Sequence, residues 1–118
     1  MEDDPVGACN FEVELGGETV GFSEVLGLGY EPEQRTVTPV TLRRGAGRDL
    51  ALWAWARKPA PRTVTITLLD ATLRPACRYV LQGARPIRYT GPELNATGND
   101  VAMEELVLTA EGLEIESR

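Results

Sequence analysis

The side chains that most often carry out catalysis are scarce in this sequence. Its 118 residues include no histidine, which removes the usual general base, its pairs with serine or cysteine, and the commonest zinc ligand. Serine occurs only as Ser23 and Ser117, and the single lysine, Lys58, stands between an arginine and a proline. Any catalysis would therefore depend on carboxylates alone, and the composition favours a binding or structural role.

The carboxylates themselves do not suggest an acid–base pair. Glu104 and Glu105 are adjacent, and adjacent residues of a strand point to opposite faces, so we expect one in solvent and the other in an ion pair. Asp49 and Asp70 are better explained as a helix cap and a turn residue. We therefore predict no enzyme activity, no catalytic residue, no bound metal and no cofactor.

Three short motifs resemble functional ones but have ordinary explanations. Asn95-Ala96-Thr97 matches a glycosylation acceptor, yet the acidic N-terminus does not resemble an export signal. Gly45-Ala46-Gly47 lacks the lysine of a phosphate loop. Because the N-terminus does not resemble an export signal, we also expect Cys9 and Cys77 to be reduced, with a disulfide as the less favoured alternative. None of these motifs identifies a function.

Charge is arranged in blocks along the chain. Residues 1–34 carry nine acids and no lysine or arginine, residues 35–88 carry eleven basic residues and two acids, and residues 89–118 carry seven acids and one arginine. The net charge of −6 disfavours specific nucleic-acid binding. The basic block can pair with the acidic ones either across strands of one chain or between copies, and the sequence leaves both open.

Alternation of apolar and polar residues predicts mostly strands. In Arg62–Asp70, threonines alternate with Val64, Ile66 and Leu68, as in a half-buried strand. One helix is expected over Asp49–Arg57, capped by Asp49 and ended by prolines. We predict a flexible acidic arm over 1–8 and a single domain over 9–118, which is mainly β. This domain is a small antiparallel barrel or sandwich of about six or seven strands with one short helix.

The longest apolar run, Leu50–Ala56, has seven residues, whereas a membrane-spanning helix needs about 20, so no membrane insertion is expected.

Several segments, in this order, resemble the contractile phage tail tube protein family. They are Gly21–Leu28, Thr41–Gly45 followed by Leu50–Trp55, Val64–Asp70, Ala84–Asn95, and Asn99–Leu106 followed by Glu111–Leu113. No single segment is specific, but together they cover about residues 10–114. The resemblance implies a tail-tube-like fold in six-membered rings that stack into a hollow inner tube. The implied partners are further copies of the chain, a sheath and a baseplate.

The resemblance leads to a structural function. We expect the inner tube subunit of a phage tail or of a phage-derived injection system, assembled in the bacterial cytoplasm. One alternative is a tube-end or adaptor ring of the same machine. The other, of a different class, is a small monomeric β-barrel that binds a ligand in a pocket containing Trp53 and Trp55.

Candidate assembly residues follow from this function. We expect one tryptophan of the helix to be buried and the other to lie near a subunit contact. The candidates for subunit contact are Phe22, Ser23, Leu28, Arg43, Arg44, Arg48, Trp53, Trp55 and Glu104. The candidates for the lumen are Thr36, Thr38, Thr63, Thr65 and Thr67.

One segment departs from the family pattern. The family usually has a longer insertion before Thr41, where this chain has only Gln34–Val40. The strand-forming residues here predict a continuous or bulged strand at Pro39 in place of a protruding loop. We expect Thr63–Leu69 to be its hairpin partner. Because the longer loop helps to join neighbours in the family, we expect rings to form readily and to stack into long tubes less readily.

Overall fold

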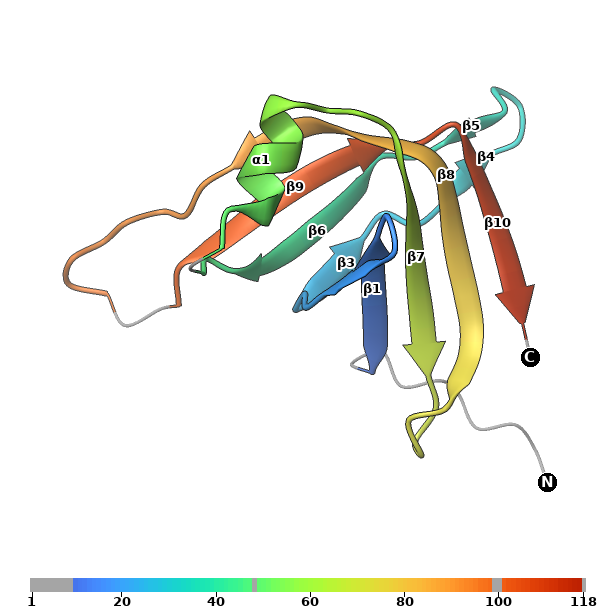
Figure 1. Cartoon of the computed structure of the whole chain (residues 1–118), viewed down its shortest axis with the longest axis horizontal. Helices are drawn as coiled ribbons and strands as arrows, with labels where there is room; N and C mark the ends of the chain where they lie inside the picture. Colours follow the sequence, from blue (N-terminus) through green and yellow to red (C-terminus); the bar gives the residue numbers. More distant parts are fainter. Residues whose placement is uncertain (1–9, 48, 99–100, 118) are drawn as a thin grey trace.

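A computed structural model describes residues 10–47, 49–98 and 101–117 of the chain (Figure 1). The expected acidic arm over 1–8, Cys9 and Arg48 lie outside the described residues. The first strands are β1 (Phe11–Leu15), β2 (Glu18–Val20), β3 (Glu24–Leu26), β4 (Tyr30–Glu31), β5 (Thr36–Val37) and β6 (Val40–Gly45). After helix α1 (Ala51–Arg57) come β7 (Arg62–Leu69), β8 (Pro75–Thr90), β9 (Met103–Thr109) and β10 (Gly112–Ser117).

Eight of these strands form one antiparallel arrangement around a shared strand. The hydrogen-bonded order is β2-β1-β7-β8-β9-β6-β3, and β10 pairs with β8 beside this path. The first part of β8 pairs with β7 and β10, and its last part, Arg85–Thr90, pairs with β9. Figure 1 shows β8 running from the first group of strands, β1, β2, β7 and β10, to the second group, β3, β6 and β9. The predicted class, mainly β with one short helix, is confirmed.

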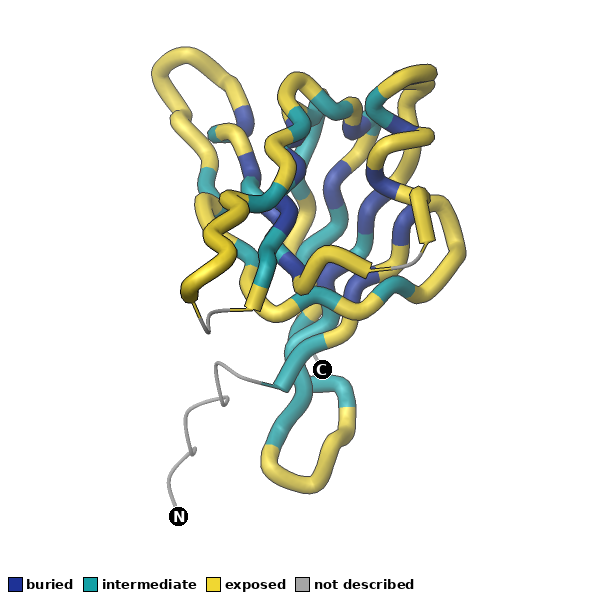
Figure 2. The backbone as a smooth tube through the Cα atoms, turned by 90° about the vertical axis from the view of Figure 1, so that its left-hand side faces the viewer, coloured by how far each residue is buried: buried dark blue, intermediate teal, exposed yellow. Residues whose placement is uncertain are grey.

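The core lies between the inward faces of these strands. In β7, Val64 and Ile66 are buried while Thr63 is exposed, as the alternation predicted. Leu106 and Leu108 of β9 are fully buried against them. Figure 2 shows buried positions inside the fold and exposed ones on the loops at its rim. This packing holds the strands in register, because a slip of one residue would turn the apolar side chains to solvent.

Helix α1 packs on β8 through one of its two apolar stripes. Leu52 and Trp55 are buried, and the Trp55 indole N–H donates a hydrogen bond to the Ala60 carbonyl at 2.7 Å. The helix begins at Ala51, two residues after the predicted start, with Leu50 at the N-cap position. Asp49 still satisfies one free donor of the first turn, because its Oδ1 accepts from the Ala51 N–H at 3.0 Å.

The expectation for the segment around Pro39 is wrong. Thr36–Val37 pairs with Tyr30–Glu31 in a separate two-stranded sheet, not with β7. This hairpin projects at the upper right of Figure 1, and Arg35 in its turn adopts a positive φ of 56°. Thr38 interrupts the strand because its N–H bonds to Gly29 and its hydroxyl to the Gly27 carbonyl at 2.6 Å. These short extra pairings also raise the strand count above the predicted six or seven, to ten in the described residues.

Candidate subunit-contact surfaces

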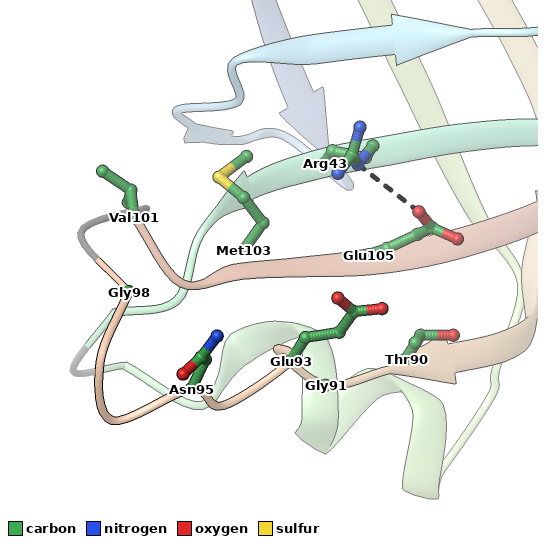
Figure 3. A pocket seen from close by; sticks show the side chains of 9 residues that line it. All are labelled: Arg43, Thr90, Gly91, Glu93, Asn95, Gly98, Val101, Met103 and Glu105. Carbon is green, nitrogen blue, oxygen red and sulfur yellow. Dashed lines mark ion pairs between the residues drawn. The ribbon is translucent and has the colours of Figure 1, made fainter.

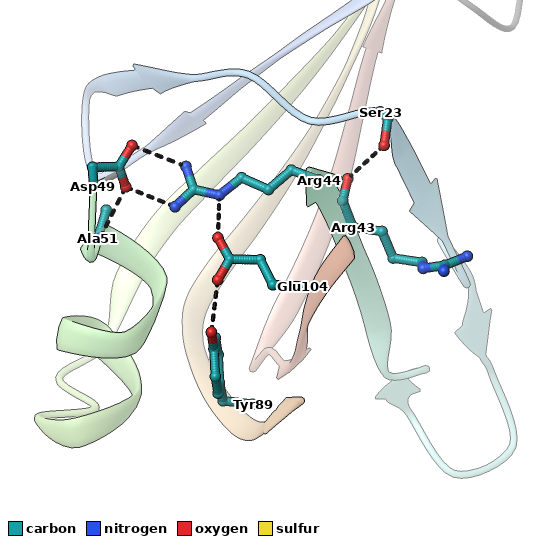
Figure 4. Close-up of polar contacts among 7 residues, drawn as sticks. All are labelled: Ser23, Arg43, Arg44, Asp49, Ala51, Tyr89 and Glu104. Atoms are coloured by element: carbon teal, nitrogen blue, oxygen red, sulfur yellow. Dashed lines mark hydrogen bonds and ion pairs between the residues drawn. The ribbon is translucent and has the colours of Figure 1, made fainter. Parts of the chain in front are cut away.

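A polar network centred on the buried residues Arg44 and Glu104 joins α1 to three strands (Figure 4). The Arg44 Nε donates to the Glu104 Oε2 at 2.6 Å, and the Arg44 Nη2 donates to the Asp49 Oδ1 at 2.6 Å. The Tyr89 hydroxyl donates to the other Glu104 oxygen at 2.7 Å. The network therefore ties β6, β9 and β8 to the start of the helix.

The bonds of this network shift the pKa values of its members. Burial by itself lowers the pKa of Arg44, but its bonds to Asp49 and Glu104 outweigh burial and raise it. The Arg44 guanidinium, and then the Ala51 N–H, lower the pKa of Asp49. The hydrogen bond to Glu104, and then partial burial, raise the pKa of the Tyr89 phenol. All of the shifts keep the network in its ion-paired form at neutral pH.

Three predicted contact residues lie inside the subunit instead. Arg44, Trp55 and Glu104 are only 8%, 1% and 6% exposed, and their polar atoms bond within the chain. The expectation that they meet a neighbouring copy is therefore wrong for this conformation. Of the two tryptophans, one is buried, as the sequence predicted.

The charge blocks meet mainly within one chain. Five of the six ion pairs among the described residues join the basic middle block to an acidic end, and only Arg44–Asp49 lies inside the middle block. Arg43, for example, reaches Glu24 at 2.7 Å and Glu105 at 3.4 Å. Both glutamates at 104 and 105 are thus paired, whereas the sequence predicted one of them in solvent. Of the two interpretations left open, pairing across strands of one chain accounts for these contacts.

A hollow of about 440 Å³ lies between the connection from β8 to β9 on one side and β6 and β9 on the other (Figure 3). It is lined by Arg43, Thr90, Gly91, Glu93, Asn95, Gly98, Val101, Met103 and Glu105. The Arg43 Nε is buried there without a hydrogen bond, although the side chain keeps its ion pairs. Acids and a base share this lining, so the hollow has no clear preference for one charge sign.

A second hollow, the β3 groove, has a volume of about 200 Å³ and an apolar lining. The residues around it are Phe11, Ser23, Glu24, Val25, Leu26, Leu28, Ile66 and Leu68. Ser23 and Leu28, both predicted at a contact, meet here, and the Ser23 hydroxyl donates to the Arg43 carbonyl at 3.2 Å. Phe22 is half-buried, with the Arg44 guanidinium 6.0 Å from its ring centre. Neither tryptophan lines this hollow or the larger one, contrary to the expectation of a tryptophan-lined ligand pocket.

Trp53 lies on the outward side of α1. It is 43% exposed, and Leu50, one turn earlier, is 68% exposed. Its ring meets the Tyr89 ring edge-on at 5.5 Å between centroids, and the Arg57 guanidinium lies 5.6 Å from its centre. The Trp53 ring is thus held by Tyr89 and Arg57, and the rest of its apolar surface is exposed to solvent.

The predicted lumen threonines occupy two separate places. Thr65 and Thr67 lie opposite Glu14 and Glu12 of β1, on the face of the sheet turned away from the core, and Thr63 precedes them on β7. Thr36 belongs to the small hairpin, and Thr38 bonds to Gly27. The expectation of one shared threonine surface is therefore wrong.

The sequence did contain a signal for the buried network. Glu104 stands two and four residues before Leu106 and Leu108 in β9, so all three lie on the same, buried face. Arg44 likewise stands two and four residues after Leu42 and Val40 in β6. An acid and a base that both point toward the core indicate a buried pair. By contrast, the β3 groove depends on three strands distant in sequence, and no local pattern reveals it.

No helix in the part of the chain described here is long and apolar enough to cross a membrane. Within the same residues, no three histidine, cysteine, aspartate or glutamate side chains gather as a metal site.

Solved structures share this fold over nearly the whole chain. The tube terminating cap of the anti-feeding prophage is 22% identical with a TM-score of 0.89, covering 100% of this chain and 95% of that one. The sheath/tube terminator of the extracellular contractile injection system PVC, in its extended state, is 24% identical with a TM-score of 0.85, covering 98% and 99%. The PVC sheath-tube complex in the same state is 23% identical with a TM-score of 0.84, covering 97% and 93%.

The sequence itself identifies the family. No curated protein matches the chain. Residues 30–114, however, match the family described as T4-like virus tail tube protein gp19. This range includes the strands β4 to β9, the helix, and the Arg44–Glu104 pair. The chain therefore belongs to the T4-like virus tail tube protein gp19 family.

Proposed function

We propose that the protein is a structural subunit of the inner tube of a contractile phage tail or phage-like contractile injection system. Hexameric rings of this chain stack into a hollow tube, and no catalytic step is involved. The observation that carries the proposal is the family match over residues 30–114. The likeness of fold to the PVC sheath-tube complex supports it.

The same reasoning gives the partners and the place of assembly. Other copies of the chain form the rings, and the further partners are sheath and baseplate proteins, by analogy with the PVC sheath-tube complex and the anti-feeding prophage baseplate. Assembly takes place in the bacterial cytoplasm before the particle is complete. Residues 9–118 act as one domain, and Thr63, Thr65 and Thr67 face the lumen.

A ring at the end of the tube is the second candidate. The fold resembles a tube terminating cap and a sheath/tube terminator as closely as it resembles a sheath-tube complex. The short hairpin of β4 and β5 also leaves less chain for contact with the next ring than the family's usual insertion. A single ring per particle, measured as the ratio of this protein to sheath, distinguishes this role from that of the main tube.

Electron microscopy and light scattering of the purified full chain test both ring roles. We expect closed six-membered rings, with few long tubes unless partner proteins are added. Long spontaneous tubes would contradict the limit on stacking. A stable monomer at high concentration would contradict ring formation, and would leave the monomeric ligand-binding module as the better explanation.

A further inference from the structure

The outward side of α1 has the properties of an unoccupied contact. Leu50, Trp53, Ala54 and Arg57 follow at helical spacing, so they share one face of the helix. Trp53 is 43% exposed although Tyr89 and Arg57 hold its ring on two sides. Because the ring is already fixed, little side-chain freedom is lost when a partner covers it. Tryptophan in such a position is a frequent centre of binding energy.

The β3 groove is the complementary surface. β3 ends the strand order and pairs only with β6 among the described residues, so its other edge is open. Open edges invite unwanted pairing and are commonly covered by a helix. The groove volume is about 200 Å³. That space suits one large side chain better than a peptide segment.

The two surfaces also differ in charge sign. The charged residue that lines the β3 groove is the acid Glu24, whose side chain stays 47% exposed although Arg43 pairs with it at 2.7 Å. Residues 50–62, which form and follow α1, carry Arg57, Lys58 and Arg62 and no acid. Opposite charge around an apolar centre favours contact between these two surfaces over contact of either with itself.

Building on the tube-subunit function above, we propose that Trp53 of one copy inserts into the β3 groove of the next copy, so that α1 covers the open edge of β3. The two surfaces are different parts of the chain, so the contact is head-to-tail. A head-to-tail contact forms a closed ring when its rotation closes. The partner at both surfaces is therefore a second copy of this chain.

Site-directed cross-linking tests the pairing directly. In a chain with Cys9→Ala and Cys77→Ala, one variant carries Ala54→Cys beside Trp53 and another carries Leu26→Cys at the groove. The two are mixed under ring-forming conditions and treated with a short bis-maleimide cross-linker. We expect covalent dimers in the mixture and none from either variant alone. The matched control replaces Leu26→Cys by Leu73→Cys, which is also on an exposed leucine (65%) but lies outside the groove, and should give no dimers.

A second variant separates contact from folding. We expect Trp53→Ala to raise the protein concentration needed for rings at least tenfold, while the dilute protein still unfolds cooperatively and loses far less stability than Trp55→Ala does. Leu73→Ala should leave ring formation unchanged. Rings that form without Ala54–Leu26 dimers, or with Ala54–Ala54 dimers, would overturn the pairing and leave the tube function intact. Failure of the unmodified chain to form any ring would instead count against the tube function itself.

Discussion

Arg44 and Glu104 lie directly opposite each other on the neighbouring strands β6 and β9, sixty positions apart in sequence, with 2.6 Å between Nε and Oε2. Their side chains are only 10% and 8% exposed. Asp49 and Tyr89 complete the bonding of the two groups. A single pair of residues thus connects the helix start to the centre of the second group of strands.

Removing one partner of this pair should be costly. We expect Glu104→Ala to lower the free energy of unfolding by ~3–5 kcal/mol, because it leaves a buried guanidinium without its nearest acid. The double variant Arg44→Met, Glu104→Leu should lose much less, since it leaves neither charge buried. Urea unfolding of dilute protein measures both. A double variant as unstable as the sum of the two single variants, Arg44→Met and Glu104→Leu, would contradict this and show that the two residues are not energetically coupled.

Acid should weaken the contact between Asp49 and the helix start. The folded pKa of Asp49 lies below its ordinary value of 3.8, chiefly because of Arg44, so Asp49 contributes stability that is present above pH 3.8 and lost as the pH falls through the lower folded pKa. We expect Asp49→Asn to be less stable than the unmodified chain at neutral pH and nearly equal at the acid end. Unfolding measured across this pH range tests the prediction, and a difference that is constant with pH would exclude it.

The two tryptophans should differ sharply in their effect on folding. Trp55 is 1% exposed, and Trp53 is 43% exposed. We expect Trp55→Ala to lower the free energy of unfolding by ~3–5 kcal/mol. Trp53→Ala should cost well under half as much in the dilute chain. Equal losses in chemical denaturation would mean that the outward side of α1 matters to folding rather than to assembly.

Gly27 should tolerate no side chain. Its φ is +89°, and a Cβ there would lie 2.4 Å from the Pro39 carbonyl oxygen, so Gly27→Ala combines backbone strain with a clash. Gly17 supplies the control, because its φ is +91° and nothing lies within 4 Å of a Cβ at that position. We expect Gly17→Ala to cost ~1–2 kcal/mol and Gly27→Ala to cost more. Thermal unfolding of both variants would refute this if the order were reversed.

Salt should weaken ring formation more than folding. The contact proposed between the α1 side and the β3 groove includes exposed charges, and these are screened over about 8–10 Å at moderate ionic strength. We therefore expect fewer rings at high salt, while the buried Arg44–Glu104 pair keeps the subunit folded. Light scattering and circular dichroism recorded in the same salt series compare the two. A ring yield that is independent of salt would show that charge pairing is confined to single subunits.

Local patterns were sufficient for those parts of the fold that depend on neighbouring residues. The alternation in β7 predicted its buried side, and the apolar run Leu50–Ala56, followed by prolines, predicted the helix. The same patterns failed at Pro39, where bonds from Thr38 to Gly27 and Gly29 decide the outcome. Those bonds join residues about ten apart across a turn, and alternation carries no information about them.

Contacts between distant strands limited the prediction of the assembly surfaces. Arg44 and Glu104 were both recognised as charged residues available for pairing, but the sequence could not show that they pair with each other inside one subunit. That depends on β6 lying beside β9. The β3 groove likewise requires β1, β3 and β7 together. Trp53 was a candidate from its helix spacing alone, because spacing on a helix does reveal which side chains share a face.

The long strand β8 is the place where the two groups of strands are joined by backbone hydrogen bonds in the described residues. In the described residues it is the strand that belongs to both groups, with Gly83 at a φ of +61° beside one register shift and a second shift between Pro86 and Arg88. The two groups also share one core, in which Val64 and Ile66 of β7 cluster with Leu106 and Leu108 of β9, so β8 and this core together fix how the groups lie against each other.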